Sequence, residues 1–424
     1  MMINPRKLAV NILTKIQKDN AYSNLTLSAY FKENEISAED KAFVTALVYG
    51  VLDRKITLDY VLSRFMKTPI KKTAPFTLNT LRTALYQIMY MDKIPESAAV
   101  NEAVKLIKKS SESRNQGFVN AVLREVLRQD NLLPEENDIQ SLSVRYSAPV
   151  WLVETFLKDY GEQTTIALLE ESLKKPPFTL KVNTLKTTTQ KLKESFEKSG
   201  VTVCETEHTD ALILLKGIDL LKNSDFKNGH FHIEDMASQK AISVLSPKKG
   251  ERVLDICAAP GGKTFTMAEI MQNEGEIIAC DLYEQRVSLI ADGADRLGID
   301  IIKPFVADAT EYNEKLSLFD AVLCDVPCSG LGVIRRKPDI KYNAAADFTE
   351  LEAIQRKILR NAVKYLKKDG RILYATCTLR KAENENMIKD FLAENKDYSL
   401  ITEQTLMPHI NNTDGFYYAL IEKH

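Results

Sequence analysis

The sequence lacks several features that would assign it to common classes of protein. It has no apolar run long enough to span a bilayer. Its first residues do not have the pattern of a signal peptide. None of its six cysteines is spaced as Cys-x-x-Cys, so no zinc site and no other metal site is expected. These absences predict a cytoplasmic protein with neither a membrane partner nor a metal.

Two familiar nucleotide-binding patterns are also absent. The sequence contains no Gly-x-Gly-x-x-Gly, and Cys257 stands where a P-loop needs its first glycine. A glycine turn is nevertheless present at residues 255–264, which read Asp-Ile-Cys-Ala-Ala-Pro-Gly-Gly-Lys-Thr. The turn lies between a short apolar strand, 252–254, and a helical pattern, 265–271. This arrangement is typical of the cofactor crevice of an α/β sheet, and a tight turn without a ligand is the alternative.

Charge is distributed unevenly along the 424 residues. Residues 1–130 contain 20 Lys/Arg and 13 Asp/Glu, a balance of +7, although the whole chain has a net charge of −1. A basic segment attached to an acidic one suggests an anionic partner, with RNA as the leading candidate. The alternative is an ordinary solvated helical surface. Hydrophobic residues make up 44% of the chain, which is enough for two or three packed domains.

The periodicity of apolar residues divides the chain into three domains. Residues 1–130 are predicted to be all-α, with a helix start at Asn4-Pro5 and further helices at 38–53, 56–66, 76–91, 97–109 and 115–129. Residues 131–144 are polar and predict a linker. Residues 145–235 predict a small α+β subdomain, with helices at 150–159, 162–172 and 188–199 and strands at 178–183, 201–203 and 211–215. In residues 236–424 strands and helices alternate, which favours a parallel, doubly wound α/β sheet.

Aspartates follow three consecutive strands of the predicted sheet. Asp255 opens the glycine turn, Asp281 follows strand 276–280, and Asp308 follows the apolar run 301–307. An acidic residue about 20 residues beyond a glycine loop suits the hydroxyls of a ribose. A carboxylate at position 308 could accept the exocyclic amine of adenine, and an N-cap of a following helix is the alternative.

Two cysteines also lie beyond strand ends, where such sheets bind ligands. Cys328 follows strand 319–324, and Cys377 follows strand 371–376. A reactive thiol must be partly exposed, whereas Cys324, within its strand, is expected to be buried. Cys328 and Cys377 are therefore the candidate nucleophiles.

The glycine turn resembles the S-adenosylmethionine (AdoMet) loop of RNA (cytosine-5) methyltransferases, and the ten residues 255–264 match that loop without a gap. The resemblance implies AdoMet as cofactor and a Rossmann-like methyltransferase core at 236–424. It also implies the following cofactor-binding residues: Cys257, Ala258, Ala259, Pro260, Gly261, Gly262, Lys263, Asp281, Arg286, Asp308 and Asp325. The alternative for Arg286 is an ordinary surface arginine.

The same resemblance implies the catalytic roles. In the RNA branch of the family the nucleophile corresponds to Cys377, and the cysteine corresponding to Cys328 assists product release. Asp325 would supply a hydrogen bond or acid at N3 of the cytosine. Spacing alone does not decide which cysteine is the nucleophile, because in related DNA enzymes the cysteine that corresponds to Cys328 attacks the base. Val326 and Thr378 replace the family's usual Ala and Ser without removing a reacting group.

Outside the core, the chain resembles the branch of the family that has an N-terminal domain. Residues 40–44 and 117–124 resemble the NusB-like RNA-binding domain, and residues 145–235 resemble an RRM-like subdomain. We expect RNA contacts from two segments, at Lys181, Asn183, Arg335, Arg336 and Lys337. A solvated loop is the alternative for residues 335–341.

The resemblance extends over the whole chain and is to bacterial enzymes that methylate 16S rRNA at cytosine 967 in the usual rRNA numbering. It implies 16S rRNA as partner, either naked or in an early assembly particle, and we expect a monomer. One alternative is methylation of another RNA, such as tRNA or 23S rRNA. A second alternative is an RNA-binding assembly factor without catalysis, although Asp325, Cys328 and Cys377 are all present.

Overall fold

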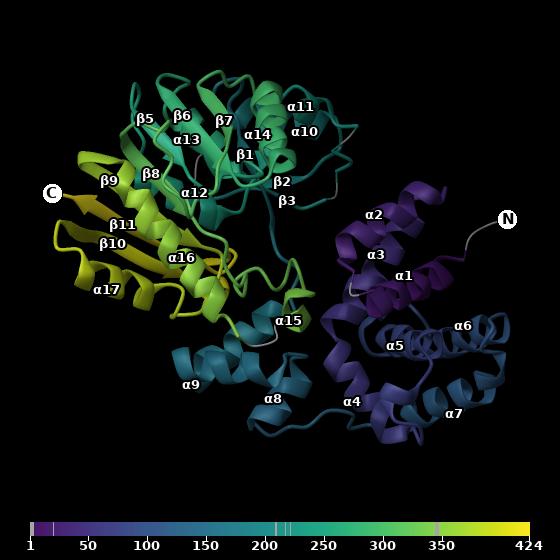
Figure 1. Ribbon diagram of the computed structural model, residues 1–424. Coiled ribbons are helices and arrows are strands. Elements are labelled where there is room, and N and C mark those ends of the chain that lie inside the picture. Colours follow the sequence, from purple (N-terminus) through teal and green to yellow (C-terminus); the bar gives the residue numbers. More distant parts are fainter. Residues whose placement is uncertain (1–3, 20, 208–209, 217, 221, 344–346) are drawn as a thin grey trace. The chain divides into compact units, whose positions relative to one another are not determined.

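The computed structural model describes the whole chain except residues 1–3, 20, 208–209, 217, 221 and 344–346. The chain forms two compact units (Figure 1). A helical unit comprises Met1–Lys174 and Lys337–Ala345, and an α/β unit comprises Lys175–Arg336 and Ala346–His424. Among the described helices, none is both long and apolar enough to cross a membrane.

The helical unit is built from amphipathic helices that bury their apolar faces in a shared core. The first helix begins as expected, with Pro5 at its first position and the Asn4 side chain accepting from the Lys7 backbone N–H at 3.1 Å. The five later helices were expected within a few residues of their bounds, whereas α2 was missed. The helices are α1 (Pro5–Asp19), α2 (Ser23–Glu33), α3 (Ala38–Asp53), α4 (Lys55–Phe65), α5 (Pro75–Tyr90), α6 (Glu96–Lys108) and α7 (Gln116–Val126).

Two further helices also belong to this unit. Residues 139–144, expected within a linker, form the first part of α8 (Ile139–Arg145). The helix forms because the Asp138 carboxylate accepts from two backbone N–H groups of its first turn. The next helix, α9 (Val150–Ser172), is broken at Gly161, where φ is +76°, and so gives the two expected helices. Both lie in the helical unit and not with the strands that follow them.

A segment from late in the sequence completes the helical unit. It contains α15 (Ile340–Asn343). The Lys341 side chain is fully buried, and its ammonium lies 2.8 Å from Asp53 Oδ1 and donates to the Asp53 carbonyl at 3.0 Å. Asp339 accepts from the backbone N–H of Ser23 at 3.2 Å. The fold of the N-terminal helices therefore includes polar contacts to residues 288 and 316 positions away.

The α/β unit begins with the expected small α+β subdomain. Four antiparallel strands form a sheet in the order β2-β3-β1-β4, and α10 packs against it through Phe196, beside Leu180, Val182 and Phe231. The elements are β1 (Phe178–Val182), α10 (Thr189–Lys198), β2 (Val203–Glu205), β3 (Ala211–Leu214), α11 (Ser224–Lys227) and β4 (Phe231–Ile233).

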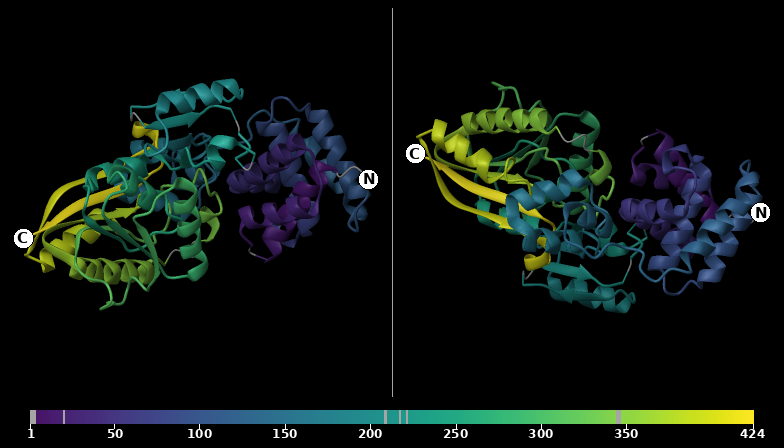
Figure 2. Two further views of the ribbon diagram at one scale, coloured as in Figure 1. Left: turned by 90° about the horizontal axis from the view of Figure 1, so that it is seen from above. Right: turned by 90° about the horizontal axis from the view of Figure 1, so that it is seen from below.

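The second sheet has seven strands in the order β10-β11-β9-β8-β5-β6-β7. Strands β5 to β9 are parallel as expected, and β11 and β10 add an antiparallel hairpin at one edge, yellow in Figure 2. The strands are β5 (Arg252–Asp255), β6 (Glu276–Asp281), β7 (Ile302–Val306), β8 (Phe319–Asp325), β9 (Leu366–Thr376), β10 (Tyr398–Leu406) and β11 (Phe416–Lys423).

Helices cover both faces of this sheet, because successive side chains on a strand point to opposite faces. Val253 packs into the core with α12, α13 and α14, while the adjacent Leu254 packs into the core with α16 and α17. The helices are α12 (Met236–Leu245), α13 (Gly262–Ile270), α14 (Glu284–Leu297), α16 (Thr349–Ala362), α17 (Glu385–Glu394) and α18 (Pro408–Asn411). Since β5, β6, β8 and β9 are parallel, the residues after their carboxyl ends meet at one edge of the sheet.

We expect Lys341→Met to destabilise the helical unit selectively. Removing the ammonium leaves the Asp53 carboxylate without its buried partner, a loss of about 3 kcal/mol. Hydrogen–deuterium exchange of the full chain measures this as faster exchange in α3 and α4. Lys337→Met is the matched control, because Lys337 lies in the same segment and is exposed. Equal exchange rates in the wild type and Lys341→Met would contradict the expectation.

Candidate active site and cofactor loop

The glycine turn joins β5 to α13, as the sequence indicated. Its shape requires glycine at position 261, where φ is +113° and a Cβ would lie 2.4 Å from the Phe265 ring. Helix α13 then begins at Gly262 with no side-chain cap. The first backbone N–H groups of α13 are therefore free of a capping side chain, and such a helix end favours a negatively charged ligand group.

Backbone and side-chain hydrogen bonds fix this loop against the end of β6. The Ala258 N–H donates to the Cys280 carbonyl at 2.7 Å, and the Ala259 N–H donates to Asp281 Oδ2 at 3.1 Å. Arg286 donates to the Ala259 carbonyl at 2.9 Å, and its guanidinium lies 3.4 Å from the Asp281 carboxylate. These contacts bring together three residues that were expected to bind the cofactor: Ala259, Asp281 and Arg286.

Lys263 is the positive charge at the centre of the site. Its ammonium lies 2.7 Å from Asp325 Oδ2 and 5.2 Å from the centre of the Phe416 ring. Burial by itself would lower the pKa of Lys263, but Asp325, followed by Glu234 and Cys377, raises it above its usual value. Lys263 therefore remains charged and connects the cofactor loop electrostatically with one of the two candidate cysteines.

A cavity of about 210 Å³ adjoins the loop. Its walls are rich in carboxylates, with Lys263 as the one positive group among the lining residues. Two buried carboxylate oxygens, Asp255 Oδ1 and Glu234 Oε1, have no hydrogen-bond partner. The lining residues are Ile233, Glu234, Asp235, Ser238, Asp255, Cys257, Ala258, Ala259, Pro260, Gly262, Lys263 and Asp325.

These groups fit the cofactor that the loop suggests. AdoMet carries a sulfonium, an ammonium and a carboxylate, so it is a net cation. Unpaired carboxylate oxygens in a buried cavity are suited to a cationic ligand, whereas the phosphates of a nucleotide would be repelled.

The two candidate cysteines lie side by side. Cys328 Sγ is 3.1 Å from Cys377 Sγ, and the Cys377 backbone N–H donates to Cys328 Sγ at 3.2 Å. Both are free thiols and partly buried, whereas Cys324 is fully buried within β8, as expected. The hydrogen bond to Cys377, together with burial, raises the pKa of Cys328 well above its usual value. Cys328 is thus held as a thiol that can donate to the Cys377 sulfur.

A buried carboxylate holds the two cysteine loops together. Glu383 accepts from the Ser329 backbone N–H at 2.9 Å and from the Ser329 hydroxyl at 2.6 Å. Gln355 and Arg380 also donate to this carboxylate, at 2.8 Å and 3.0 Å. The Ser329 hydroxyl lies 2.7 Å from that of Thr378, which follows Cys377. Glu383 therefore fixes the residue after Cys328 against the residue after Cys377.

The backbones of three segments meet at Cys377. The Gly332 N–H donates to the Cys377 carbonyl at 3.0 Å, and the Gly415 N–H donates to the Gly332 carbonyl at 2.9 Å. A Cβ at Gly332 would lie 1.9 Å from the Gly415 carbonyl oxygen, so only glycine fits this crossing. The separation of the two thiols is thus set by backbone as well as by side-chain contacts.

Comparisons with known proteins agree with this architecture. Residues 242–422 match the family described as 16S rRNA methyltransferase RsmB/F, residues 3–128 match the NusB family, and residues 148–220 match the ferredoxin-like domain of RsmF/B-like methyltransferases. The chain is 38% identical to a probable ribosomal RNA small subunit methyltransferase B of Bacillus subtilis, over 99% of this chain and 98% of the relative. The chain belongs to this methyltransferase family.

Solved structures support the same fold. The crystal structure of PH0851 aligns with a TM-score of 0.83 at 27% identity and covers 100% of both chains. The structure of NSun6 from Pyrococcus horikoshii with SFG aligns with a TM-score of 0.59 at 22% identity, covering 65% of this chain and 98% of that one. Because the identity to NSun6 is only 22%, this similarity supports the fold alone. The all-α NusB-like domain, the α+β subdomain and the Rossmann-like core expected from the sequence are confirmed.

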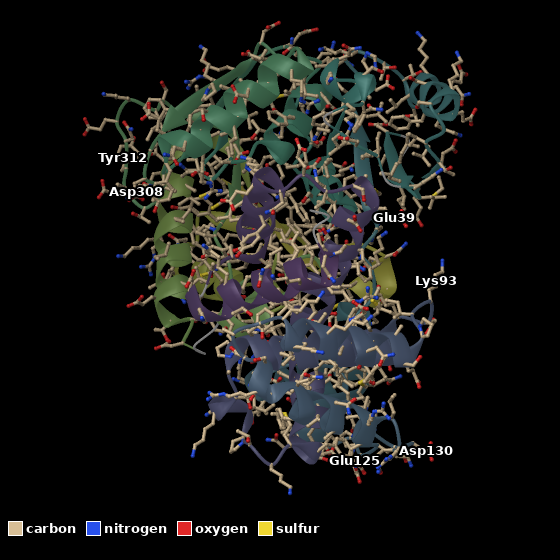
Figure 3. All side chains as sticks on the ribbon, turned by 90° about the vertical axis from the view of Figure 1, so that its right-hand side faces the viewer. Glu39, Lys93, Glu125, Asp130, Asp308 and Tyr312 are labelled. Carbon is tan, nitrogen blue, oxygen red and sulfur yellow. The ribbon has the colours of Figure 1, made fainter. Side chains whose placement is uncertain are left out.

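Asp308 is exposed just after β7, as Figure 3 shows, and is not among the residues that line the cavity. Its carboxylate accepts from the backbone N–H and the hydroxyl of Thr310, at 2.8 Å and 2.7 Å. The alternative of an N-cap is wrong, because residues 307–318, all of them described, contain no helix. Asp308 thus stabilises a turn and remains exposed to solvent. Its contact with adenine stays a prediction.

The first pair of expected RNA-binding residues is buried. The Lys181 ammonium lies 2.8 Å from the Glu269 carboxylate of α13, with only 5% of its side chain exposed. Asn183 is fully buried and donates to the carbonyls of Gly229 and Leu297, at 2.8 Å and 2.9 Å. Burial therefore does not favour RNA contact at these two positions, which join the α+β subdomain to the methyltransferase core.

The arginines of the second expected RNA segment also serve the fold. Arg335 is buried and donates to Asp414 at 3.1 Å. Arg336 donates to Asp235 at 2.8 Å and also pairs with Asp414, so both arginines hold the turn before β11. RNA contact at Arg335 and Arg336 is thus not supported, because protein carboxylates already occupy both guanidinium groups. Lys337 is exposed, and its contact with RNA stays a prediction.

Two functional candidates were missed by the sequence analysis. Glu383 lies shortly before α17, and Glu234 lies between β4 and α12. Neither residue belongs to a pattern that reveals its partners, because Glu383 acts on a loop 54 positions earlier and Glu234 on α13. Burial of an acidic side chain was the missing information, and a single sequence does not report it.

We expect Asp255 to make stability depend on pH. Burial raises the pKa of Asp255 to about 7, despite the hydrogen bond from Thr264. The folded chain therefore binds more protons at this site than the unfolded chain between about pH 4 and pH 7, so stability falls as pH rises through that window. Asp255→Asn should remove this part of the pH dependence. Chemical denaturation of both proteins at several pH values measures the difference, and parallel curves would contradict it.

We expect Glu383→Gln to slow methyl transfer about tenfold to a hundredfold while leaving AdoMet binding unchanged. The loss follows because the charged hydrogen bonds that position both cysteine loops are weakened, whereas Glu383 does not line the cofactor cavity. Single-turnover transfer to rRNA and calorimetric AdoMet binding separate the two effects. Glu385→Gln is the control, since Glu385 bonds Thr405 and touches neither cysteine loop. Equal rates for the two variants would show that Glu383 does not position the site.

Proposed function

We propose that this protein transfers the methyl group of AdoMet to C5 of a cytosine in 16S rRNA, through a covalent bond between Cys377 and C6 of the base. The observation that carries the proposal is the pair of thiols 3.1 Å apart at the ends of β8 and β9. Cytosine C5 is a weak nucleophile, so the reaction needs a thiolate at C6 to activate it. An enzyme with this chemistry also needs a cation-binding cavity beside the thiols.

The cavity at the glycine turn would hold the cofactor. Bound AdoMet supplies an electrophilic methyl group. The start of α13 and Lys263 favour its carboxylate, and the ring of carboxylates around the cavity favours its positive charges. Asp281 at the end of β6 would bind the ribose, with Arg286 of α14 beside it at the cofactor loop, and Asp308 remains the candidate for the adenine.

Cys377 acts as the nucleophile in this proposal. Its thiolate forms a bond to C6, and negative charge develops on the ring toward N3. Cys328 keeps its proton and donates to the Cys377 sulfur, which stabilises the thiolate before attack. Asp325, held by Lys263, would provide the polar contact at N3.

Release of the product reverses the addition. A base removes the proton from the methylated C5, the double bond between C5 and C6 forms again, and the Cys377 sulfur leaves as a thiolate. Cys328 is the group placed to assist this departure, because its sulfur lies 3.1 Å from the sulfur that leaves. The pair then returns to its starting protonation state.

The names of the relatives support the proposed rRNA target. The Bacillus subtilis relative is described as a probable small subunit rRNA methyltransferase, which favours 16S rRNA over tRNA or 23S rRNA. We infer cytosine 967 as the base, a monomer acting in the cytoplasm, and a substrate that is naked or in an early assembly particle. An assembly factor without catalysis is less favoured, because such a protein has no need to hold two thiols in contact.

We expect Cys377→Ala to abolish methyl transfer and Cys328→Ala to accumulate protein linked to RNA. The first variant loses the bond to C6, and the second loses the donor that assists its cleavage. Purified protein, unmodified 16S rRNA and methyl-labelled AdoMet provide the assay, with denaturing gels to detect linked protein. Cys204→Ala is the control, because Cys204 lies in β2 of the other sheet.

The opposite pattern would reverse the two roles. If Cys328→Ala lost both transfer and linkage while Cys377→Ala trapped the adduct, Cys328 would be the nucleophile. If the wild type methylated tRNA or 23S rRNA and not 16S rRNA, the target would be wrong while the chemistry stood.

A further inference from the structure

A buried carboxylate at the cofactor cavity has an unused oxygen. Glu234 lies between β4 and α12, with 6% of its surface exposed. Its Oε2 accepts a short hydrogen bond from the Thr266 hydroxyl, whereas Oε1 is buried without a partner. A buried carboxylate oxygen that lacks a donor is costly, so its retention calls for an explanation.

The unused oxygen faces the start of α13. A Cβ placed on Gly262 would lie 3.7 Å from Glu234 Oε1, with no other atom nearer. Glu234, Gly262 and Lys263 all line the same cavity. The nearby ammonium of Lys263 donates to Asp325, and Glu234 Oε1 has no hydrogen-bond partner. Oε1 thus belongs to the cavity wall next to the helix end that favours a ligand carboxylate.

We propose that Glu234 binds the α-ammonium group of the cofactor, through a hydrogen bond from that ammonium to its free Oε1. The inference rests on the proposed function, since it takes AdoMet as the ligand. An amino acid places its ammonium and its carboxylate on the same carbon atom. If the carboxylate lies at the backbone N–H groups that begin α13, the ammonium is brought beside Glu234.

The charge environment supports an ammonium at this position. Burial raises the pKa of Glu234, and His232, Thr266 and Lys263 only partly oppose that effect. A ligand cation would supply the missing stabilisation of the carboxylate. The same contact serves the demethylated product, S-adenosylhomocysteine, because the product keeps the ammonium and loses only the sulfonium charge. Glu234 therefore recognises the amino-acid part of the ligand and not the methyl group.

Calorimetric binding to the full chain tests the proposal with three ligands: AdoMet, S-adenosylhomocysteine and 5′-methylthioadenosine, which lacks the amino-acid part. We expect Glu234→Gln to weaken the first two about tenfold to a hundredfold and to leave the third unchanged, because only the first two offer an ammonium. Glu269→Gln is the matched control, since Glu269 is an equally buried carboxylate that pairs with Lys181 outside the cavity lining. The variant Glu269→Gln should not alter the relative affinities for the three ligands.

Glu234→Asp provides a second variant, which keeps the charge but withdraws the carboxylate, and the same selective loss is expected. Equal weakening of all three ligands by both variants would assign Glu234 a purely structural role and overturn the proposal. Unchanged binding of all three would also overturn it. If the wild type binds none of the ligands, the proposed function itself is wrong. If the wild type binds them and Glu234→Gln binds them equally well, only the role of Glu234 is wrong.

Discussion

One partly buried positive charge, the ammonium of Lys263, makes the interaction on which the site depends. It lies 2.7 Å from Asp325 and stands in a cavity whose other charged lining groups are carboxylates. Because burial makes unpaired charges costly, these carboxylates keep Lys263 charged, and Lys263 in turn makes their burial tolerable. The remaining negative charge is left for a cationic ligand. The cofactor loop and the loop that carries Cys328 are thereby linked by charge as well as by the parallel strands that precede them.

The thiols are positioned by a second set of contacts, made by a buried carboxylate and by the backbone. Glu383 fixes Ser329, and the crossing of Gly332 and Gly415 leaves no room for a side chain behind Cys377. Sulfurs on two separate strands can stay in contact only if both loops are held, since a shift of about 1 Å in a reacting group can cost a hundredfold in rate. Hydrogen bonds and backbone contacts thus position the thiols, whereas charged side chains dominate the cavity beside the glycine turn.

Several basic residues that seemed suited to RNA instead support the fold. Lys181, Arg335 and Arg336 pair with carboxylates inside the α/β unit, and Lys341 does so inside the helical unit. A phosphate cannot compete easily for a cation that is buried beside a carboxylate, because moving either partner leaves a charge without compensation. Of the five residues expected to bind RNA, the exposed Lys337 is the one whose position still suits a phosphate contact.

The sequence alone determined the local features of this protein: most helices and strands, the parallel core, and a glycine turn flanked by aspartates and cysteines at strand ends. These features depend on periodicity and on neighbours in the chain, which a sequence displays directly. The tertiary structure decided which charges are buried. Lys181 and Arg335 proved structural, residues 337–345 joined the helical unit, and Glu234 and Glu383 emerged at the site. Each outcome depends on a partner many residues away, and the burial of a charge is decided only when those partners come together.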